Sequence, residues 1–266
     1  MCRVRFAAAF LLAILPALAE DPPPADPPAT DEPGKETARR PRAGEVEPAE
    51  PGTKIEDPAV ARDKAARFQD DLKSATSEAG AAEIAKKLGD WDHPEILKAL
   101  ARVLDDKNRY LAIEAALACA RQTDRERAGA TLHRALRAEK RTDVVCALLV
   151  AMGKVKYDKA VKDAEKWFRK DTTESHKAAV RYLGMIQSKE SFRMLAEKLE
   201  EPKPARVDDP KNPPASWWKE RWAEWSSNLP YVKKALASIV PGETFDTLQE
   251  AKDWAEKHGR EHGVKW

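Results

Sequence analysis

Two histidines near the C-terminal end of the chain have the spacing of a zinc-binding pair. The stretch HGREH places His258 and His262 four residues apart, with Glu261 before the second histidine. In the H-x-x-E-H pattern two imidazoles one helical turn apart hold zinc, and the glutamate acts as a base. Gly259 interrupts this pattern, and the sequence around Lys257 predicts instead a helix that stops at the glycine. We therefore expect no metal site, and metal-dependent hydrolysis is the least favoured interpretation.

No other arrangement of residues predicts catalysis. His93, His133 and His176 are scattered, and we expect them at helix starts or in solvent. The sequence contains no His-Glu dipeptide and no nucleotide-binding glycine motif. Asp92 lies two residues before Pro94, where capping of the following helix explains it. We therefore expect a protein that is not an enzyme and that binds no cofactor.

Four tryptophans lie within the ten residues SWWKERWAEW, which begin at Ser216. If this stretch is a helix, Trp218, Trp222 and Trp225 share one face, and Trp217 lies at its flank. The favoured interpretation is that the indoles pack against the preceding helices and close the end of a core. In the alternative interpretation they form an exposed aromatic surface that stacks on sugar rings or on a proline-rich peptide. That surface would make the protein a carbohydrate- or cell-envelope-binding module.

The elements that must position these residues are helices. Over residues 58–201 the composition favours helices, and the pattern of apolar residues repeats along the chain. Alanine, leucine, lysine and glutamate dominate, and alternating β-branched runs do not occur. Two apolar columns recur every 31 or 32 residues: Leu100, Leu132, Ala164 and Leu195, and four residues on, Leu104, Leu136, Phe168 and Leu199. Gly89, Gly153 and Gly184 follow the first helix of a pair, where we expect a positive φ. Each period predicts a helix pair that buries its apolar face only by stacking on its neighbours.

The stretches IAKKLGDWDHPEILKALARVLDD and KAAVRYLGMIQSKESFRMLAEKLEE resemble HEAT repeats, in the short bacterial HEAT-like form. The resemblance extends from Ile84 to Glu201. It implies an all-α fold in which antiparallel, armadillo-like helix pairs form a right-handed α-solenoid. It also implies a scaffold for protein–protein interaction rather than a catalyst.

Six basic residues form two columns in the register of the repeat, and we call them the basic stripe: Lys98, Lys162 and Arg193, and one turn on, Arg102, Arg134 and Lys166. Both columns lie opposite the leucines of the second helices, so we expect them to face solvent. Such a ladder suits an acidic protein, an acidic peptide or an anionic glycan. The alternative is a solvated face that only keeps the protein soluble. We expect a protein or peptide partner, with polysaccharide as the alternative, and no nucleic acid, because the charge asymmetry is small.

After residue 201 the register of the repeat breaks. EPKPARVDDPKNPPA holds five prolines and predicts a loop over residues 202–215. A Trp-rich C-terminal cap should follow over 216–266, with helices at Trp217–Asn228, Tyr231–Ile239 and Thr247–Lys257. The segment ALASIVPGETFDTLQEAKDWAEKHG is similar to the closing unit of exported bacterial HEAT-repeat proteins, in which a tryptophan helix finishes the stack.

The first 57 residues predict export. MCRVRFAAAFLLAILPALAE has two arginines before an apolar run and small residues at its end, so we expect residues 1–19 to be a signal peptide that is cleaved near Ala19. Residues 20–57 contain nine prolines and eleven acids against five bases, and they predict a disordered acidic linker. No later stretch is apolar enough to span a membrane. We expect a periplasmic or extracellular protein in which Cys119 and Cys146 are buried thiols.

Overall fold

The computed structural model describes residues 50–170, 173–204 and 211–266, all of which belong to the unit Gly44–Trp266. Among these residues the chain forms eleven α-helices and only two strands of two residues each, which confirms the predicted all-α class. The predicted signal peptide, residues 20–49 of the predicted linker, and residues 205–210 of the predicted loop lie outside the described residues.

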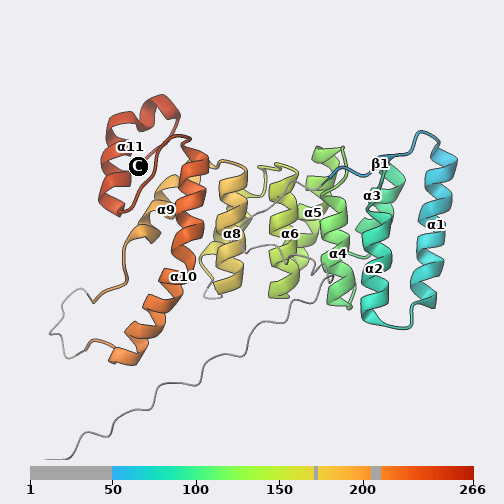
Figure 1. Cartoon of the computed structure of the whole chain (residues 1–266), viewed down its shortest axis with the longest axis horizontal. Helices are drawn as coiled ribbons and strands as arrows, with labels where there is room; N and C mark the ends of the chain where they lie inside the picture. The colour runs from blue at the N-terminus through green and yellow to red at the C-terminus, as the bar shows by residue number, and fades with distance from the viewer. Residues whose placement is uncertain (1–49, 171–172, 205–210) are drawn as a thin grey trace, which may run out of the picture. The chain divides into compact units, whose positions relative to one another are not determined.

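The helices alternate between two layers (Figure 1). The first layer contains α2 (Glu78–Leu88), α4 (Arg109–Cys119), α6 (Thr142–Lys154), α8 (Thr173–Met185) and α10 (Ala215–Ile239), and each packs against the next. The second contains α1 (Pro58–Ser74), α3 (Pro94–Ala101), α5 (Arg125–Ala138), α7 (Val161–Phe168), α9 (Phe192–Ala196) and α11 (Leu248–His262). From α1 to α9, each second-layer helix packs against the first-layer helix that follows it, and α11 packs against α9. The 3₁₀ turns η1 (Lys189–Ser191) and η2 (Glu197–Leu199) flank α9.

The core lies between the two layers and is built from the predicted apolar columns. All eight column residues are at most 4% exposed: Leu100, Leu132, Ala164, Leu195, Leu104, Leu136, Phe168 and Leu199. Phe68, one period upstream on α1, is 2% exposed. The 31- and 32-residue intervals therefore mark the positions at which successive helix pairs bury their apolar faces.

The glycines at the ends of the first-layer helices correct one expectation. Gly89 has a helical φ of −64°, and Gly153 and Gly184 lie inside α6 and α8, so none needs a positive φ. These positions instead allow neighbouring helices to approach closely. A Cβ on Gly89 would lie 2.5 Å from the Cβ of Ala118 in α4, and a Cβ on Gly184 would lie 2.8 Å from the Cα of Ala235 in α10. A Cβ on Gly153 would collide with a methionine of α8.

Residues 50–57 correct the boundary of the predicted linker, because they belong to the fold. Strand β1 (Thr53–Lys54) pairs in parallel with β2 (Trp91–Asp92). The N–H of Gly52 donates to the carbonyl of Arg121 at 3.1 Å, and Ile55 is only 8% exposed. Ile55 is a large aliphatic residue in a segment that has few of them, so it supplies the apolar surface that holds these residues against the helices.

Asp92 does not cap the helix that follows it, which was the predicted role. His93 is the N-cap of α3, and its Nδ1 accepts from the N–H of Glu95 at 3.1 Å. Asp92 is 6% exposed and accepts instead from the N–H and the hydroxyl of Thr123, one repeat further on. This carboxylate therefore joins two successive units.

The C-terminal region contains one helix fewer than predicted. The two helices expected at Trp217–Asn228 and Tyr231–Ile239 are a single helix, α10, which continues through the exposed Pro230. Its buried residues begin at Asn228 and lie in its second half. The N-terminal half of α10 therefore carries the tryptophans without burying a large apolar side chain of its own.

Cys119 and Cys146 are free thiols in the structure. Cys119 is fully buried, and burial raises its pKa to about 12, while partial burial raises the pKa of Cys146 to about 11. Across the described ranges, no helix has the length and apolarity needed to cross a bilayer.

Candidate functional site

The C-terminal histidine pair lies on α11, which does not stop at Gly259 as expected. The helix continues to His262 and ends on Gly263, whose φ is 71°. Both imidazoles lie beside the buried Trp254, with ring centroids 6.1 Å away for His258 and 5.2 Å away for His262. Among the described residues, no group of three or more His, Cys, Asp or Glu side chains could hold a metal ion. Packing against Trp254 accounts for the position of both histidines.

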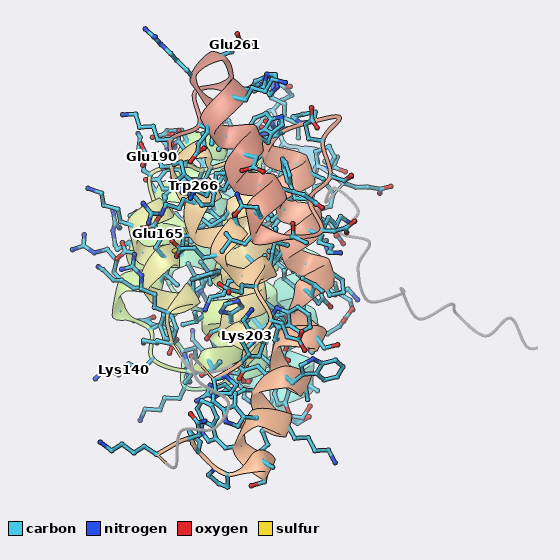
Figure 2. All side chains as sticks on the ribbon, turned by 90° about the vertical axis from the view of Figure 1, so that its left-hand side faces the viewer. Lys140, Glu165, Glu190, Lys203, Glu261 and Trp266 are labelled. Carbon is cyan, nitrogen blue, oxygen red and sulfur yellow. The ribbon has the colours of Figure 1, made fainter. Side chains whose placement is uncertain are left out.

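The four tryptophans of α10 do not close the core, which corrects the favoured interpretation. Trp217 is 37% exposed and Trp222 is 47% exposed, while Trp218 and Trp225 are half-buried. None of the four belongs to the hydrophobic core or packs against it. Burial in the last units comes instead from the second half of α10 and from α11, where the buried Trp254 contacts aromatic rings of the core. Figure 2 faces α10 and α11 and shows side chains projecting from both.

The indoles nevertheless have defined partners at the end of the preceding unit. The Nε1 of Trp225 donates to the carbonyl of Lys198 at 3.0 Å, and the Nε1 of Trp222 donates to the Glu201 carboxylate at 2.5 Å. The Nε1 of Trp218 is enclosed and has no hydrogen-bond partner. Trp217 packs edge-on against Trp218 at a centroid distance of 4.6 Å. The tryptophans thus form a surface that is ordered by polar contacts and remains partly open to solvent.

The basic stripe lies on the second-layer helices, as predicted from the register. All six side chains are exposed: Lys98 and Arg102 at α3, Arg134 on α5, Lys162 and Lys166 on α7, and Arg193 on α9. The second-layer helices that carry these residues are not all in contact with one another. α3 contacts α5, whereas no comparable contact joins α5 to α7 or α7 to α9 within the described part of the chain. The structure therefore places the six cations on one layer, without bringing them into direct contact.

Three members of the stripe are paired with acids of their own helix or turn. Lys98 lies 3.8 Å from Glu95, Lys166 lies 2.7 Å from Asp163, and Arg193 lies 3.0 Å from Glu197. Arg193 also lies over the ring of Trp266, 5.8 Å from its centroid. These pairs are solvent-exposed and contribute little to stability. The paired acids do, however, make the positive potential of the stripe weaker than that of six unpaired cations.

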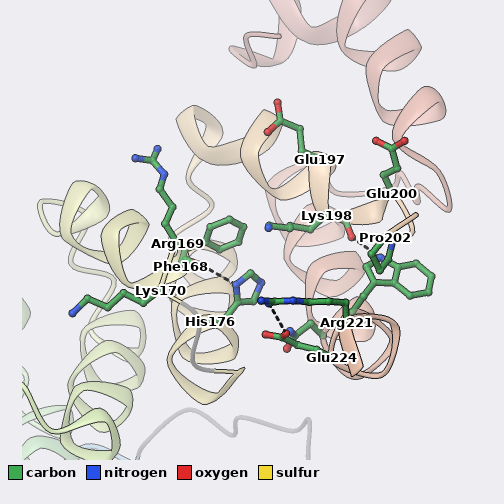
Figure 3. A pocket seen from close by; sticks show the side chains of 12 residues that line it. Phe168, Arg169, Lys170, His176, Glu197, Lys198, Glu200, Pro202, Arg221 and Glu224 are labelled. Atoms are coloured by element: carbon green, nitrogen blue, oxygen red, sulfur yellow. Dashed lines mark hydrogen bonds and ion pairs between the residues drawn. The ribbon is translucent and has the colours of Figure 1, made fainter. Parts of the chain in front are cut away.

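A pocket of about 380 Å³, which sequence reasoning missed, lies where the end of α7 and the start of α8 meet η2 and α10 (Figure 3). Its aromatic wall consists of Phe168 and Trp225. His176 and Asn228 provide buried polar groups, and they are only 8% and 7% exposed. His176 was expected at a helix start or in solvent; it lies in the first turn of α8, but it is buried.

The two buried polar side chains of this pocket have unused hydrogen-bonding capacity. The Nδ1 of His176 lies 2.8 Å from the carbonyl oxygen of Phe168 and must donate to it, which leaves Nε2 as an acceptor in the neutral ring. Burial lowers the pKa of His176 and favours this neutral form. The Oδ1 of Asn228 is enclosed by protein and has no hydrogen-bond partner. A pocket that contains two such acceptors can recognise a ligand that supplies hydrogen-bond donors.

The charged groups around the pocket are not balanced. Its three carboxylates each lie within ion-pair distance of a base: Glu197 with Arg193, Glu200 with Lys203, and Glu224 with Arg221, at 3.0, 3.9 and 3.3 Å. The cations Arg169, Lys170 and Lys198 make no ion pair with a carboxylate in the described residues. Lys170 and Lys198 lie instead over the rings of Trp167 and Phe168. The pocket therefore favours an anion.

A signal for Asn228 was present in the sequence. On α10 the buried residues Val232, Leu236 and Ile239 recur at helical spacing, and Asn228 precedes Val232 by four residues on the same face. A polar residue on an apolar stripe marks a buried polar site. His176 had no such signal, because its burial depends on η2 and α10, which come later in the chain.

In comparisons with known proteins, no protein-family model and no curated sequence matches this chain.

Proposed function

We propose that this protein is a HEAT-like, right-handed α-solenoid that acts as a non-catalytic scaffold and binds an acidic protein or peptide through its repeat surface. Two features support the repeat architecture: the two layers of alternating helices, and the burial of both apolar columns at 31- and 32-residue intervals. Stacked helix pairs of this kind offer an extended surface on which neighbouring units supply equivalent positions.

The observation that carries the binding role is the exposure of all six side chains of the basic stripe on the second-layer helices. Arg102, Arg134 and Lys162 make no ion pair in the described residues, so their charge is available to a partner. Cations repeated along successive helices match carboxylates repeated along an extended acidic chain.

The test is the binding of poly-glutamate, measured by calorimetry at low and at high salt. We expect Arg134→Glu with Lys162→Glu to weaken binding at least about tenfold and to reduce its salt dependence, because two attractive charges become repulsive. Reversal of Lys64 and Lys73 on α1, outside the stripe, is the matched control and should weaken binding less than about twofold. Equal affinity and an equal salt dependence in the two double variants would rule out the stripe.

A second candidate function is supported by the exposure of Trp217 and Trp222 on α10. In this alternative the Trp217–Trp225 face is a carbohydrate- or cell-envelope-binding module, in which indoles stack on sugar rings. Retention on insoluble polysaccharide that survives high salt, and that is lost in Trp217→Ala/Trp222→Ala, would favour this function over the basic stripe. Retention that disappears at high salt would count against it.

We also propose that the protein is exported, that residues 1–19 are removed near Ala19, and that the mature protein is periplasmic or extracellular. The two arginines, the apolar run and the small residues of MCRVRFAAAFLLAILPALAE support this proposal. The mass of the mature N-terminal peptide, recovered from the cell envelope or the medium of an expressing bacterium, tests it directly.

A further inference from the structure

The pocket between α7, α8, η2 and α10 differs from two other pockets of similar size in the described part of the chain. One of these, about 400 Å³ in volume, contains Arg141 and Glu139, which form an ion pair at 2.7 Å. The other, about 370 Å³, contains Arg67 and Asp63, which pair at 3.0 Å. Neither contains a buried polar side chain without a partner among the described residues. Of these three pockets among the described residues, the one that contains Asn228 combines such a group with cations that lack carboxylates.

The amide of Asn228 is costly in the free protein. The residue is 93% buried, and the structure gives its Oδ1 no hydrogen bond, although a buried polar group without a partner costs about 1–3 kcal/mol. The Nε2 of His176 likewise has no partner among the described residues, since Nδ1 makes the bond to Phe168. Two acceptors that face the same pocket suit a ligand that offers N–H donors, as the peptide groups of a chain do.

The cations add a requirement for negative charge. Lys198 points toward His176 and is near enough for its charge to act on the imidazole, while Arg169, at the end of α7, lines the pocket but directs its guanidinium away from Lys198 (Figure 3). A volume of about 380 Å³ exceeds that of one acidic side chain and can also hold the adjoining peptide group. The exposed Trp222 continues the surface along α10, where flanking residues of an extended chain can pack.

We propose that this pocket binds a glutamate or aspartate of an extended peptide in the partner. Lys198 holds the carboxylate, and the Oδ1 of Asn228 and the Nε2 of His176 accept hydrogen bonds from N–H groups of the adjoining peptide backbone. The inference rests on the proposed function and identifies where on the scaffold the acidic partner is anchored. It adds sequence selectivity, because the basic stripe alone would hold any acidic chain.

The probe for this proposal is a heptapeptide with blocked termini and one central glutamate flanked by alanine and proline. The control peptide is identical except that it has glutamine at the centre. We expect saturable binding of the glutamate peptide, seen by calorimetry and by a change in Trp225 emission. The glutamine peptide should bind at least about tenfold more weakly. Equal binding of the two peptides, or preferential binding of a hexuronate oligosaccharide, would overturn the proposal.

Three variants test the residues. Lys198→Gln and Asn228→Ala should each weaken the glutamate peptide at least about tenfold, whereas Lys219→Gln, an exposed lysine of α10 outside the pocket, should change binding less than about twofold. Because Asn228 is buried, binding by Asn228→Ala is interpreted only if this variant unfolds cooperatively. Lys198→Gln alters an exposed side chain, so it tests the proposal even if Asn228→Ala does not fold. Binding by Lys198→Gln equal to that of the unmodified protein would refute the proposal.

The two proposals fail in different ways. If poly-glutamate binding is lost on reversal of Arg134 and Lys162 but unchanged by Lys198→Gln, the scaffold function stands and the pocket is not the anchor. In the opposite case, Lys198→Gln abolishes binding of the heptapeptide, while charge reversal at Arg134 and Lys162 leaves poly-glutamate binding intact. The pocket is then the binding site, and the basic stripe is not the binding surface.

Discussion

His176 shows how a single titratable group depends on the elements around it. Its ring stacks on Phe168 at a centroid distance of 4.3 Å, and its Nδ1 donates to the carbonyl of the same residue. Burial is the largest cause that lowers its pKa, and the positive charge of Lys198 acts in the same direction. The folded protein therefore resists protonation of this ring, whereas the unfolded chain does not.

This difference predicts a pH dependence of stability. Below about pH 6.5 the unfolded chain binds a proton at His176 that the folded protein excludes, so the free energy of unfolding should fall as the pH drops through that value. Above about pH 7.5 both states are neutral at this residue and the dependence should vanish. Denaturant melts over this range should show a smaller slope in His176→Gln than in the unmodified protein. His262→Gln, which changes an exposed histidine, is the control, and an unchanged slope in His176→Gln would contradict the assignment.

At the scale of elements, the first-layer helices are held together by close approach at glycine and alanine. Gly89 faces Ala118 across α2 and α4, and Gly184 faces Ala235 across α8 and α10. At such short separations backbone atoms of neighbouring helices make dispersion contacts that larger side chains would prevent. The small residues therefore act in packing between units and not in ending a helix.

This packing predicts that one added methyl group destabilises the protein. Gly184→Ala would place a Cβ 2.8 Å from the backbone of α10, and it should lower the free energy of unfolding by about 1–3 kcal/mol. Gly80→Ala in α2 is the matched control. Its Cβ would meet only the Ser77 hydroxyl, at 3.1 Å, so stability should change by less than about 1 kcal/mol. Chemical denaturation compares the two, and equal stabilities would show that α8 and α10 are not in close contact.

At the scale of the whole described chain, two groups of tryptophans have different roles. Trp254 on α11 is 9% exposed and contacts Phe192 and Phe245 in the core. Trp222 on α10 is 47% exposed and lies outside that core. The last units are therefore completed by α11, while the indole of Trp222 remains exposed to solvent.

This division predicts a difference in stability and in fluorescence. Trp254→Ala should cost about 3–5 kcal/mol, because it removes a buried indole from an aromatic cluster. Trp222→Ala removes an exposed side chain and should cost less than about 1 kcal/mol. Emission lost in Trp222→Phe should be red-shifted and accessible to acrylamide. A large loss of stability in Trp222→Ala, with blue and protected emission, would restore the interpretation in which the α10 tryptophans close the core.

Features that depend on local spacing could be predicted from the sequence. The apolar columns that contain Leu100 and Leu104 recur at a fixed interval, and an apolar stripe on a helix must be buried, so the helices and their core residues follow directly. The exposure of the basic stripe follows from the same periodicity, since its residues lie opposite the buried ones. Asp57 and Pro58 also mark the start of α1 by their local chemistry.

Features that depend on which distant segments meet required the tertiary structure. Gly184 is small because Ala235 lies against it, and the carboxylate of Asp92 is used by Thr123 rather than by its own helix. His176 is buried only because η2 and α10 cover the start of α8. Periodicity specifies which face of a helix is covered, but not which residue covers it. The sequence by itself therefore determined the helices and their buried faces, whereas the close contacts between units, the exposed tryptophans and the pocket that contains His176 and Asn228 were decided by tertiary packing.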